Sequence, residues 1–410
     1  MLFFYFSLLI CIQIPFADGI TFKDFNSANY LPPGQAAATL GLGWVREDLS
    51  WANIEKTKGY YNWNNFDQKV LRAHSEGVEV LPLLAYTPDW DRVIPHTAGS
   101  PPKDYSRWLA FVRAAVERYT KPPYNIKYFQ VWNEPTKKAS YWLASQNEFI
   151  DKIYIPAANI IRNNKAKVVF GGWPASNSLK EYEETLNYHD AISYTDILDV
   201  HYRNLGGYNT LFKKYIATGK VMGLWQTELG YTTSPEFISR VYIPLLHWAL
   251  KNNWHSKEQY KVFWYPGWGS IEQEPRGLTT TKNRQVLLTS NGQELALITS
   301  IFGDGALSIL PVNVTKVDKN EVYGFKVGLN KGVIAITRDF KSVQASTITY
   351  HFNEGRSINE ANIFYPGGER QLIKLEQNSS NTTLTLDEKV FRYTCVKCFS
   401  STIYVVYTTK

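Results

Sequence analysis

Cysteine and methionine are scarce in this chain of 410 residues, which has 3 Cys and 2 Met. Cys11 lies in the apolar N-terminal stretch, so a chain that loses this stretch keeps only Cys395 and Cys398. A zinc site needs about four ligands and a redox CxxC pair needs a thioredoxin-like setting, and neither pattern is visible. Whether Cys395 and Cys398 form a disulfide stays open, because residues three apart on a straight strand face opposite ways.

Other patterns that identify large functional classes are also absent from the sequence. No Gly-rich phosphate loop follows a strand, no GxSxG elbow occurs, and no His/Asp/Glu cluster has metal-ligand spacing. The formal charge is +7, yet its Lys and Arg residues are interspersed with acidic ones and form no arm for a nucleic acid. We therefore expect no cofactor, no metal and no nucleic-acid partner. The excess positive charge favours solubility or, alternatively, a substrate with some acidic units.

Long apolar runs are missing beyond the first residues, "MLFFYFSLLICIQIPFADG". Their apolar stretch of about fourteen residues ends at Ala17, which is typical of a secretory signal and too short for a comfortable membrane span. We predict a signal peptide over residues 1–17, a secreted protein, and no stable membrane insertion. An uncleaved anchor is the alternative, because no Lys or Arg precedes the apolar core. The triplets at Asn313, Asn378 and Asn381 are glycosylation acceptors, in agreement with secretion.

The region from residue 18 to 304 alternates strand-like runs with helical patterns. Most of the strand candidates are short, nearly continuously apolar, and polar at the C-terminal end, as in a parallel sheet buried on both faces. The candidates are "ITFKDF", "GWVRED", "VEVLPLLAY", "YFQVWNEP", "KVVFGGW", "ILDVHY", "LWQTELG" and "KVFWYPGW". Amphipathic helices separate them, and Gly77 is placed to end the helix before the third strand. Eight β/α units in this length predict a (β/α)8 TIM barrel, an α/β fold.

The pattern changes after about residue 305. Short alternating runs such as "GVIAITRDF" and "STIYVVYTTK" are separated by Gly, Asn and Pro turns. This predicts a C-terminal antiparallel β-sandwich over residues 305–410, following a catalytic barrel over residues 18–304.

Two glutamates stand near the ends of barrel strands. Glu134, in "QVWNEP", is predicted to end the fourth strand, and Glu228, in "LWQTELG", the seventh. Functional groups in such barrels gather where the strands meet the loops that follow them. Two carboxylates facing each other across the mouth are what cleavage of a glycosidic bond requires, since one protonates the leaving oxygen while the other attacks or directs water.

These motifs resemble those of the clan A glycoside hydrolases, and the pattern is similar to family 39, which includes β-xylosidases and iduronidases. "WVREDLSWANIEKTKGYYNWNNFDQKV" resembles the second-strand region of that family, "DVHYR" the sixth and "FWYPGW" the eighth. The resemblance spans nearly the whole chain after the signal. It implies a retaining mechanism, with Glu134 as acid/base and Glu228 as nucleophile. It also implies that Arg46 lies near the nucleophile, with His201 and Tyr202 nearby, and that Trp264 floors the sugar subsite.

Further roles follow from chemistry. Arg46 would favour the ionised form of Glu228, although it could equally pair with Glu47 or Asp48. His201 or Tyr202 could donate a hydrogen bond to Glu228, and Asn133 is placed to hold the 2-hydroxyl of the sugar. Aromatic residues make up 15% of the chain, and Tyr86, Trp90 and Trp264 are candidates for stacking on sugar faces. For Tyr86 and Trp90, ordinary packing is an equal alternative.

The sequence therefore predicts a secreted retaining glycosidase that acts on an oligosaccharide or polysaccharide. A catalytically silent glycan-binding barrel is the first alternative, but it would not need both glutamates. A lyase or a transglycosylase on the same site is the second, and its products would distinguish it. The sugar, the linkage, exo or endo action and the oligomeric state are not determined by these patterns.

Overall fold

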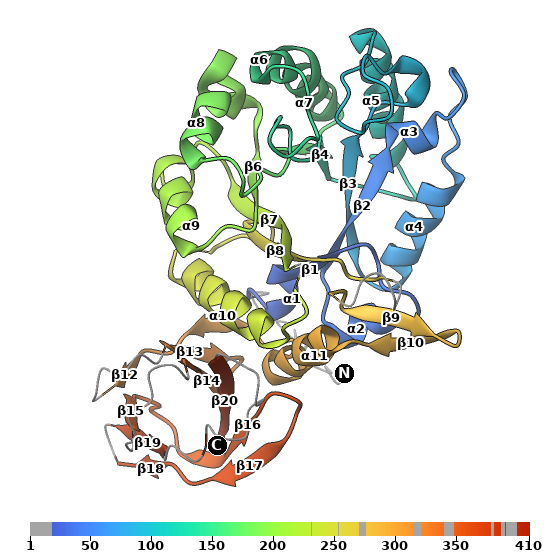
Figure 1. The fold of residues 1–410 in the computed structure, drawn as a ribbon. Helices are drawn as coiled ribbons and strands as arrows, with labels where there is room; N and C mark the ends of the chain where they lie inside the picture. The colour runs from blue at the N-terminus through green and yellow to red at the C-terminus, as the bar shows by residue number, and fades with distance from the viewer. Residues whose placement is uncertain are drawn as a thin grey trace, which may run out of the picture.

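The computed structural model describes residues 19–230, 232–252, 254–269, 276–314, 321–339, 348–378, 381–386, 390 and 400–410. The predicted signal segment, Cys395 and Cys398 lie outside these ranges. Eight parallel strands close into a barrel in chain order, surrounded by helices, which confirms the predicted (β/α)8 fold (Figure 1). The strands are β1 Asn26–Asn29, β2 Trp44–Ser50, β3 Glu79–Ala85, β4 Tyr128–Val131, β5 Lys167–Val169, β6 Ile197–His201, β7 Gly223–Gly230 and β8 Tyr260–Tyr265.

Amphipathic helices cover the outside of the barrel. In α5 the buried positions recur at helical spacing, and Gly77 adopts a φ of 70° just after α4, as predicted for the residue that ends this helix. The α-helices are α1 Phe22–Phe25, α2 Ala36–Thr39, α3 Trp51–Ile54, α4 Asn64–Ser75, α5 Tyr105–Tyr119, α6 Gln146–Glu148, α7 Ile155–Asn163, α8 Leu179–Asn187, α9 Leu205–Leu211, α10 Glu236–Lys251 and α11 Ser290–Phe302. Short helical segments of other types occur at Asp89–Asp91, Phe149–Tyr154, Tyr188–Tyr194 and Phe212–Ile216.

The prediction for the first strand was wrong. The segment "ITFKDF" contains the one-turn helix α1, and β1 is the polar segment that follows it, "NSAN". Thr21 and Asp24 form a capping box, with the Thr21 amide donating to the Asp24 carboxylate at 2.8 Å, which favours a helical turn here. The apolar pattern missed β1 because all four of its residues are buried although three of them are polar.

Two layers of side chains fill the barrel. The lower layer is an apolar cluster with one residue from each of β2 to β8: Trp44, Leu81, Tyr128, Val169, Ile197, Trp225 and Phe263. Because side chains alternate along a strand, the residues two positions further toward the mouth also face inward. They include Arg46, Gln130, Asp199 and Thr227, all buried, so the upper layer of the barrel is polar.

The C-terminal region consists of two antiparallel sheets packed on a common core. Their shared core includes Ile336 and Val405 of one sheet and Tyr350 and Leu384 of the other. The first sheet has the order β11 Leu307–Ile309, β13 Glu321–Val327, β14 Lys331–Asp339, β20 Ser400–Thr409, β16 Ile358–Phe364 and β17 Arg370–Ile373. The second has the order β12 Val312–Val314, β15 Ile348–Phe352, β19 Thr382–Leu386 and β18 Glu376–Gln377. This is the arrangement of a β-sandwich.

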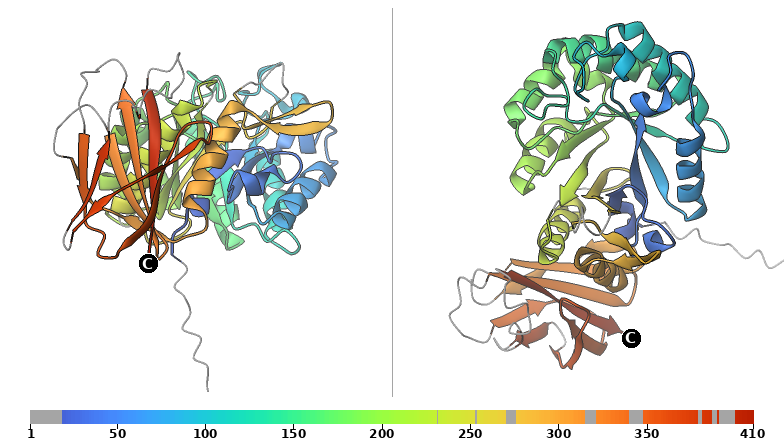
Figure 2. Two further views of the ribbon diagram at one scale, coloured as in Figure 1. Left: turned by 90° about the horizontal axis from the view of Figure 1, so that it is seen from below. Right: turned by 45° about the vertical axis from the view of Figure 1, so that its right-hand side comes forward.

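Helices α10 and α11 lie between the barrel and the sandwich, which packs below the barrel in Figure 1 and in the right-hand view of Figure 2. A short hairpin, β9 Thr279–Lys282 and β10 Gln285–Leu288, follows β8 on the barrel side. The predicted boundary at residue 305 falls between α11 and β11.

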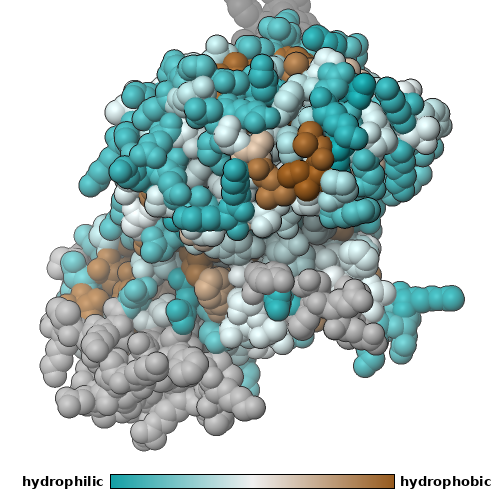
Figure 3. All heavy atoms as spheres, turned by 45° about the horizontal axis from the view of Figure 1, so that its top comes forward, coloured by the Kyte–Doolittle hydropathy of each residue, from teal (hydrophilic) through white to brown (hydrophobic). Residues whose placement is uncertain are grey.

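The outer face of the barrel is mostly hydrophilic, with small apolar areas between the polar side chains (Figure 3). This agrees with helices that turn one apolar face inward and a polar face to water. Among the described residues, none of the helices combines the length and the apolar character that a membrane span requires.

Candidate active site

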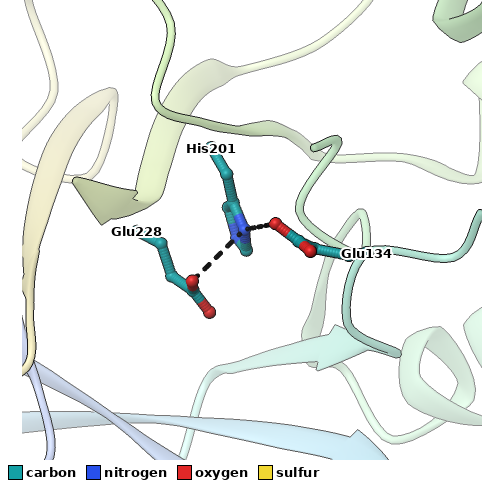
Figure 4. Close-up of side chains that lie close together, drawn as sticks. All are labelled: Glu134, His201 and Glu228. Atoms are coloured by element: carbon teal, nitrogen blue, oxygen red, sulfur yellow. Dashed lines mark hydrogen bonds and ion pairs between the residues drawn. The ribbon is translucent and has the colours of Figure 1, made fainter. Parts of the chain in front are cut away.

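Glu134 and Glu228 meet at the mouth of the barrel (Figure 4). Glu228 lies within β7, whereas β4 ends at Val131, so Glu134 stands three residues beyond the strand that it was predicted to end. One oxygen of Glu134 and one of Glu228 lie within 4.8 Å of each other. Both side chains are partly open to solvent, with 15% and 13% of their surface exposed. The two predicted carboxylates therefore form a pair that a ligand can reach.

Cationic and hydroxyl donors surround Glu228. Arg46 Nη1 donates to Glu228 Oε1 at 2.7 Å, and the Tyr202 hydroxyl donates to Oε2 at 3.2 Å. Burial alone would raise the pKa of Glu228, but the positive charges of His201 and Arg46 outweigh burial and hold this pKa below its usual value. Glu228 is thus kept as a carboxylate with an electron pair available for attack.

Among the described residues, the ion pair of Arg46 is with Glu228 and not with Glu47 or Asp48. The Glu47 side chain points away from the barrel axis and accepts from Lys69 at 2.6 Å. Arg46 itself points inward, is 3% exposed, and donates to Glu228, Gln130 and Asn133.

His201 lies between the two carboxylates, as Figure 4 shows. Its Nδ1 is 2.9 Å from Glu134 Oε1 and 3.6 Å from Glu228 Oε2. The shorter contact is with Glu134, so of the two predicted donors to Glu228 the one with a hydrogen bond is Tyr202. Burial lowers the pKa of His201, but the charge of Glu228 and the hydrogen bond to Glu134 raise it more, and the net pKa is above the usual value.

A buried relay behind His201 fixes which of its nitrogens carries hydrogen. The Thr227 hydroxyl donates to Asp199 Oδ2 at 2.6 Å, so its oxygen is left to accept from His201 Nε2, 3.0 Å away. The Thr227 amide and the Gln130 side chain also donate to Asp199. Burial raises the pKa of Asp199 to about 6 despite these donors, so Asp199 is ionised at neutral pH. Nε2 of His201 then carries a hydrogen, and Nδ1 faces Glu134.

Gly172, in the loop after β5, leaves the space that His201 occupies. A Cβ atom at position 172 would lie 1.9 Å from His201 Nε2, closer than any real contact. His201 can therefore adopt its observed position only because residue 172 is a glycine.

Only the oxygen of the Asn133 side-chain amide is hydrogen-bonded among the described residues. Its Oδ1 accepts from Arg46 Nη2 at 2.6 Å, and its Nδ2 has no partner among the described residues. The amide nitrogen is thus available as a donor beside the two glutamates, which is compatible with the predicted contact to a sugar hydroxyl.

Trp264 does not lie where a sugar could stack on it. Its neighbour Phe263 belongs to the inward-facing layer of the barrel, so by alternation Trp264 points outward to the helices. There it is fully buried, beside Phe237 and Tyr242, with its ring under Gly230. The prediction that Trp264 forms a stacking surface for the sugar was wrong, because Trp264 lies on the outward face of β8.

The other two aromatic candidates differ in position. Tyr86 follows β3 with a φ of 70°, is half-buried, and packs near Trp132 and Tyr141 at the rim. Burial, followed by the charge of Asp48, raises its pKa well above the usual value, and Glu228 adds to this effect. Tyr86 is therefore close enough to the site for the charge of Glu228 to affect its pKa.

Trp90 is anchored away from the glutamates. Its Nε1 donates to the Glu55 carbonyl at 2.7 Å, its ring packs edge-on against Trp51, and the Arg107 guanidinium lies over its face, 6.0 Å from the centroid. These contacts are those of a packing residue, the alternative that the sequence left open.

Strained backbone gathers at this mouth. Tyr30, Tyr86, Trp132, Glu134 and Tyr202 all follow barrel strands and all have positive φ values, from 41° to 70°. Such conformations are uncommon for residues with a side chain and concentrate at functional sites.

No protein-family model matches the chain. The chain is 26% identical over 142 residues to a β-xylosidase of Caldicellulosiruptor saccharolyticus, a match that covers 32% of this chain and 29% of that protein. The structure of the present chain resembles that of a family 30 subfamily 8 xylanase from Clostridium acetobutylicum. The TM-score is 0.64 and the sequence identity is 14%, and the match covers 96% of this chain and 97% of the xylanase. It also resembles a family 39 glycoside hydrolase from Bacteroides cellulosilyticus, with a TM-score of 0.63 and 15% identity over 94% and 81%.

The chain has the fold of the clan A glycoside hydrolases. This confirms the resemblance that the sequence motifs carry, with family 39 among the similar structures. At these identities the structural likeness establishes the fold alone, and the chain spans less than a third of the matched β-xylosidase.

Within the barrel, sequence reasoning missed the polar layer beneath the glutamates. Gln130, Asp199 and Thr227 each interrupt an otherwise apolar strand near its C-terminal end. A polar residue in such a position must find a buried partner, and this signal was present in the strands "YFQVW", "ILDVH" and "LWQTELG".

Glu134, His201 and Glu228 are also donor types that transition metals accept, and their atoms lie within 4.8 Å of one another. Arg46 already places a positive charge on Glu228, and the raised pKa of His201 favours a proton on its Nδ1. The charge of Arg46 would repel a divalent cation placed beside Glu228.

Proposed function

We propose that the protein is a retaining β-glycoside hydrolase in which Glu228 is the nucleophile and Glu134 the acid/base. The observation that carries this proposal is the separation of the carboxylates, within 4.8 Å at their nearest ligand atoms. Retaining glycosidases hold the two carboxyl groups about 5–5.5 Å apart, whereas inverting enzymes need roughly 6.5–9.5 Å to admit a water molecule.

The surroundings of the two carboxylates support this division of roles. Arg46 and Tyr202 occupy both oxygens of Glu228 and favour its ionised form, as a nucleophile requires. Glu134 contacts only His201 through Oε1, and its Oε2 has no partner among the described residues. Oε2 can therefore carry a proton toward a leaving oxygen.

In the first step a Glu228 oxygen attacks the anomeric carbon while the glycosidic C–O bond breaks. The proton of Glu134 passes to the leaving oxygen, which departs as an alcohol, and the sugar stays on Glu228 as an ester. In the second step Glu134, now a carboxylate, removes a proton from water, and the resulting hydroxide displaces Glu228. The two inversions restore the original anomeric configuration.

The carbohydrate class is proposed from the names of similar proteins. The matched β-xylosidase and the structurally similar xylanases act on β-xylosides by name, and a similar structure is named an endo-β1,6-glucanase. We propose a β-linked pyranoside, with β-xylosides the first to be assayed. The acidic units suggested by the net charge remain a prediction.

We also propose that the protein is secreted. In support, Asn313 and Asn378 are exposed on the sandwich, as glycosylation acceptors have to be. Expression in a secreting eukaryotic host, followed by enzymatic removal of N-glycans, should lower the mass of the secreted chain. A cell-retained protein of unchanged mass would contradict this proposal.

The catalytic proposal is tested by rescue with azide. Glu228→Gly should lose hydrolysis of aryl β-xylosides and aryl β-glucosides, and azide should restore turnover to the α-glycosyl azide. Glu134→Gly should instead yield the β-glycosyl azide, since its nucleophile remains. A Glu228→Gly variant with ordinary activity would end the proposal, and so would wild-type protein that binds glycans without cleaving them. Unsaturated or transferred products from the wild type would favour a lyase or a transglycosylase.

A further inference from the structure

A groove runs along the rim of the barrel beside β1 and β2. Part of it lies between α4, the segment after β1 and Trp268, and the neighbouring part continues past Asp48 and Ser50 toward α3. Tyr30 and three residues of α4 border both parts. The residues that define this rim groove for the argument are Tyr30, Asp48, Asn65, Gln68, Lys69 and Trp268.

The rim groove begins next to the nucleophile. Asn29, the last residue of β1, accepts from Arg46 at 3.0 Å, and Arg46 contacts Glu228. Tyr30 follows immediately, and its hydroxyl donates to Asp48 at 3.3 Å. In the closed ring, β1 and β2 are separated from the loop that carries Glu134 by β3. The groove thus leaves the site on the side of Arg46, away from Glu134.

This direction identifies the part of a substrate that the groove would meet. Glu134 protonates the leaving oxygen, so the leaving portion extends past Glu134. The sugar that becomes attached to Glu228 extends the opposite way, and its non-reducing neighbours follow it toward Tyr30 and Trp268.

The groove surface has the chemistry that binds sugars. The indole of Trp268 is 44% exposed, and its Nε1 donates to Thr281 Oγ1 at 3.3 Å, which fixes the ring. Asn65 and Gln68 are exposed, and their side-chain amides have no hydrogen-bond partner among the described residues. A flat aromatic ring for the C–H face of a sugar and amides for its hydroxyls make a suitable combination.

The cations in the part of the groove beside Trp268 are already paired. Lys69 Nζ lies 2.6 Å from Glu47 Oε2, and the Glu47 side chain is buried. Arg72 donates to the carbonyls of Leu31 and Pro32 and lies 3.4 Å from Glu76. Lys69 and Arg72 are the two cations that line the part of the groove beside Trp268, and because both are paired, this part offers no uncompensated positive charge to a uronate.

We infer that the rim groove is a subsite for a neutral sugar on the non-reducing side of the cleaved bond, with Trp268 as its stacking surface. The enzyme then prefers chains that extend beyond the sugar attached to Glu228, and it cleaves within them rather than removing single terminal sugars. This inference rests on the proposed glycosidase function and deepens it.

The test compares aryl glycosides of increasing length. The kcat/KM values of 4-nitrophenyl β-xyloside, β-xylobioside and β-xylotrioside, and of the matching β-glucosides, are measured for the wild type, Trp268→Ala and Gln68→Ala. Leu329→Ala serves as the control, because Leu329 is an exposed apolar residue of the sandwich region, 76% exposed. Trp268→Phe, which keeps an aromatic face, separates stacking from folding, and thermal melting checks that each variant is folded.

The wild type should prefer the bioside to the monoside. Trp268→Ala should lower kcat/KM for biosides about tenfold, from the loss of one aromatic contact, and leave any monoside activity within about twofold. Trp268→Phe should recover much of the loss, and Leu329→Ala should change neither substrate. Equal losses on both lengths, no loss at all, or tighter binding of uronate-bearing chains would overturn the subsite. A wild type inactive on every aryl glycoside would instead reject the proposed function itself.

Discussion

The Nδ1 atom of His201 lies 2.9 Å from Glu134 and 3.6 Å from Glu228, so one imidazole contacts both carboxylates of the site. Behind it, Thr227 and Asp199 hold the other ring nitrogen. His201 is therefore linked to a chain of side chains that extends from the barrel mouth into its interior, and the charge of Asp199 in this chain helps to raise the pKa of His201.

Removal of the charge of Asp199 should act on His201 through this chain. Asp199→Asn is close in shape but loses an anion that raises the pKa of His201, so this pKa should fall. The imidazole signals of the variant and the wild type, followed by NMR against pH, measure the shift.

Thr227 offers a matched pair of variants for the same relay. Thr227→Val removes the hydroxyl that joins His201 to Asp199, whereas Thr227→Ser keeps it. Thr227→Val should reproduce the direction of the Asp199→Asn shift, and Thr227→Ser should behave as the wild type. Identical titrations in all three proteins would mean that the relay does not control His201.

Loss of Arg46 should weaken the nucleophile at low pH. Arg46→Gln removes a charge that lowers the pKa of Glu228, so this pKa should rise. Glu228 would then need a higher pH to ionise, and the acidic limb of the kcat/KM profile should move to higher pH, with a maximum reduced about 100-fold. Arg118→Gln, which breaks an ion pair with Asp67 in the outer helices, is the control and should leave the profile in place. An unmoved acidic limb in Arg46→Gln would contradict the role assigned to Arg46.

A side chain at position 172 should displace His201. Gly172→Ala places a methyl group on the imidazole, and either the ring or the loop after β5 must move. We expect a loss of activity of at least about tenfold with a smaller change in melting temperature than core substitutions cause. Gly355→Ala is the comparison, because no atom lies within 4 Å of its added Cβ. Full activity in Gly172→Ala would show that the position of His201 matters little.

The contact between the barrel and the sandwich should become less stable as the pH rises through about 7. Glu294 of α11 is buried, accepts from Ser239 of α10, and Ser239 accepts from Tyr404 of β20 at 2.7 Å. Burial raises the pKa of Glu294 from its usual value of 4.5 to about 7. Because the folded state binds this proton more tightly, its stabilising effect is complete below pH about 4.5 and is lost as the pH rises through about 7.

The resulting loss in the free energy of unfolding is up to about 3 kcal/mol above pH 7. Glu294→Gln has no proton to lose, so its melting temperature should fall less than that of the wild type between pH 5 and pH 8. Parallel melting curves for the two proteins over this range would exclude the effect.

The sequence predicted those parts of the molecule that depend on short-range patterns. Apolar runs ending in polar residues located β2 to β8, and the positions of Glu134 and Glu228 at two such ends identified the site. Strand β1 was not predicted from the apolar pattern, because its residues Asn26, Ser27 and Asn29 are polar although they are buried. Asn29 donates to the Thr227 carbonyl, which is distant in sequence and becomes its neighbour only when the ring closes, whereas Ser27 Oγ has no hydrogen-bond partner among the described residues.

The same limit explains the error at Trp264. The motif "FWYPGW" indicates an aromatic residue near the mouth, but only the register of β8 against its neighbours decides which residue faces inward. Phe263 and Tyr265 share the inward face, and Trp264 takes the outward one. The contact of His201 with Glu134 was likewise missed, because it depends on the loop after β4 turning back toward β6.

The central claim is that Glu228 forms a covalent bond to the sugar. A 2-deoxy-2-fluoro β-xyloside or β-glucoside with a good leaving group slows the second step, so the intermediate should accumulate and add the mass of one fluorosugar to the protein. Mass spectrometry of the digested protein should place this mass on the peptide that contains Glu228. Label on another residue, or turnover to an inverted product without label, would contradict the account.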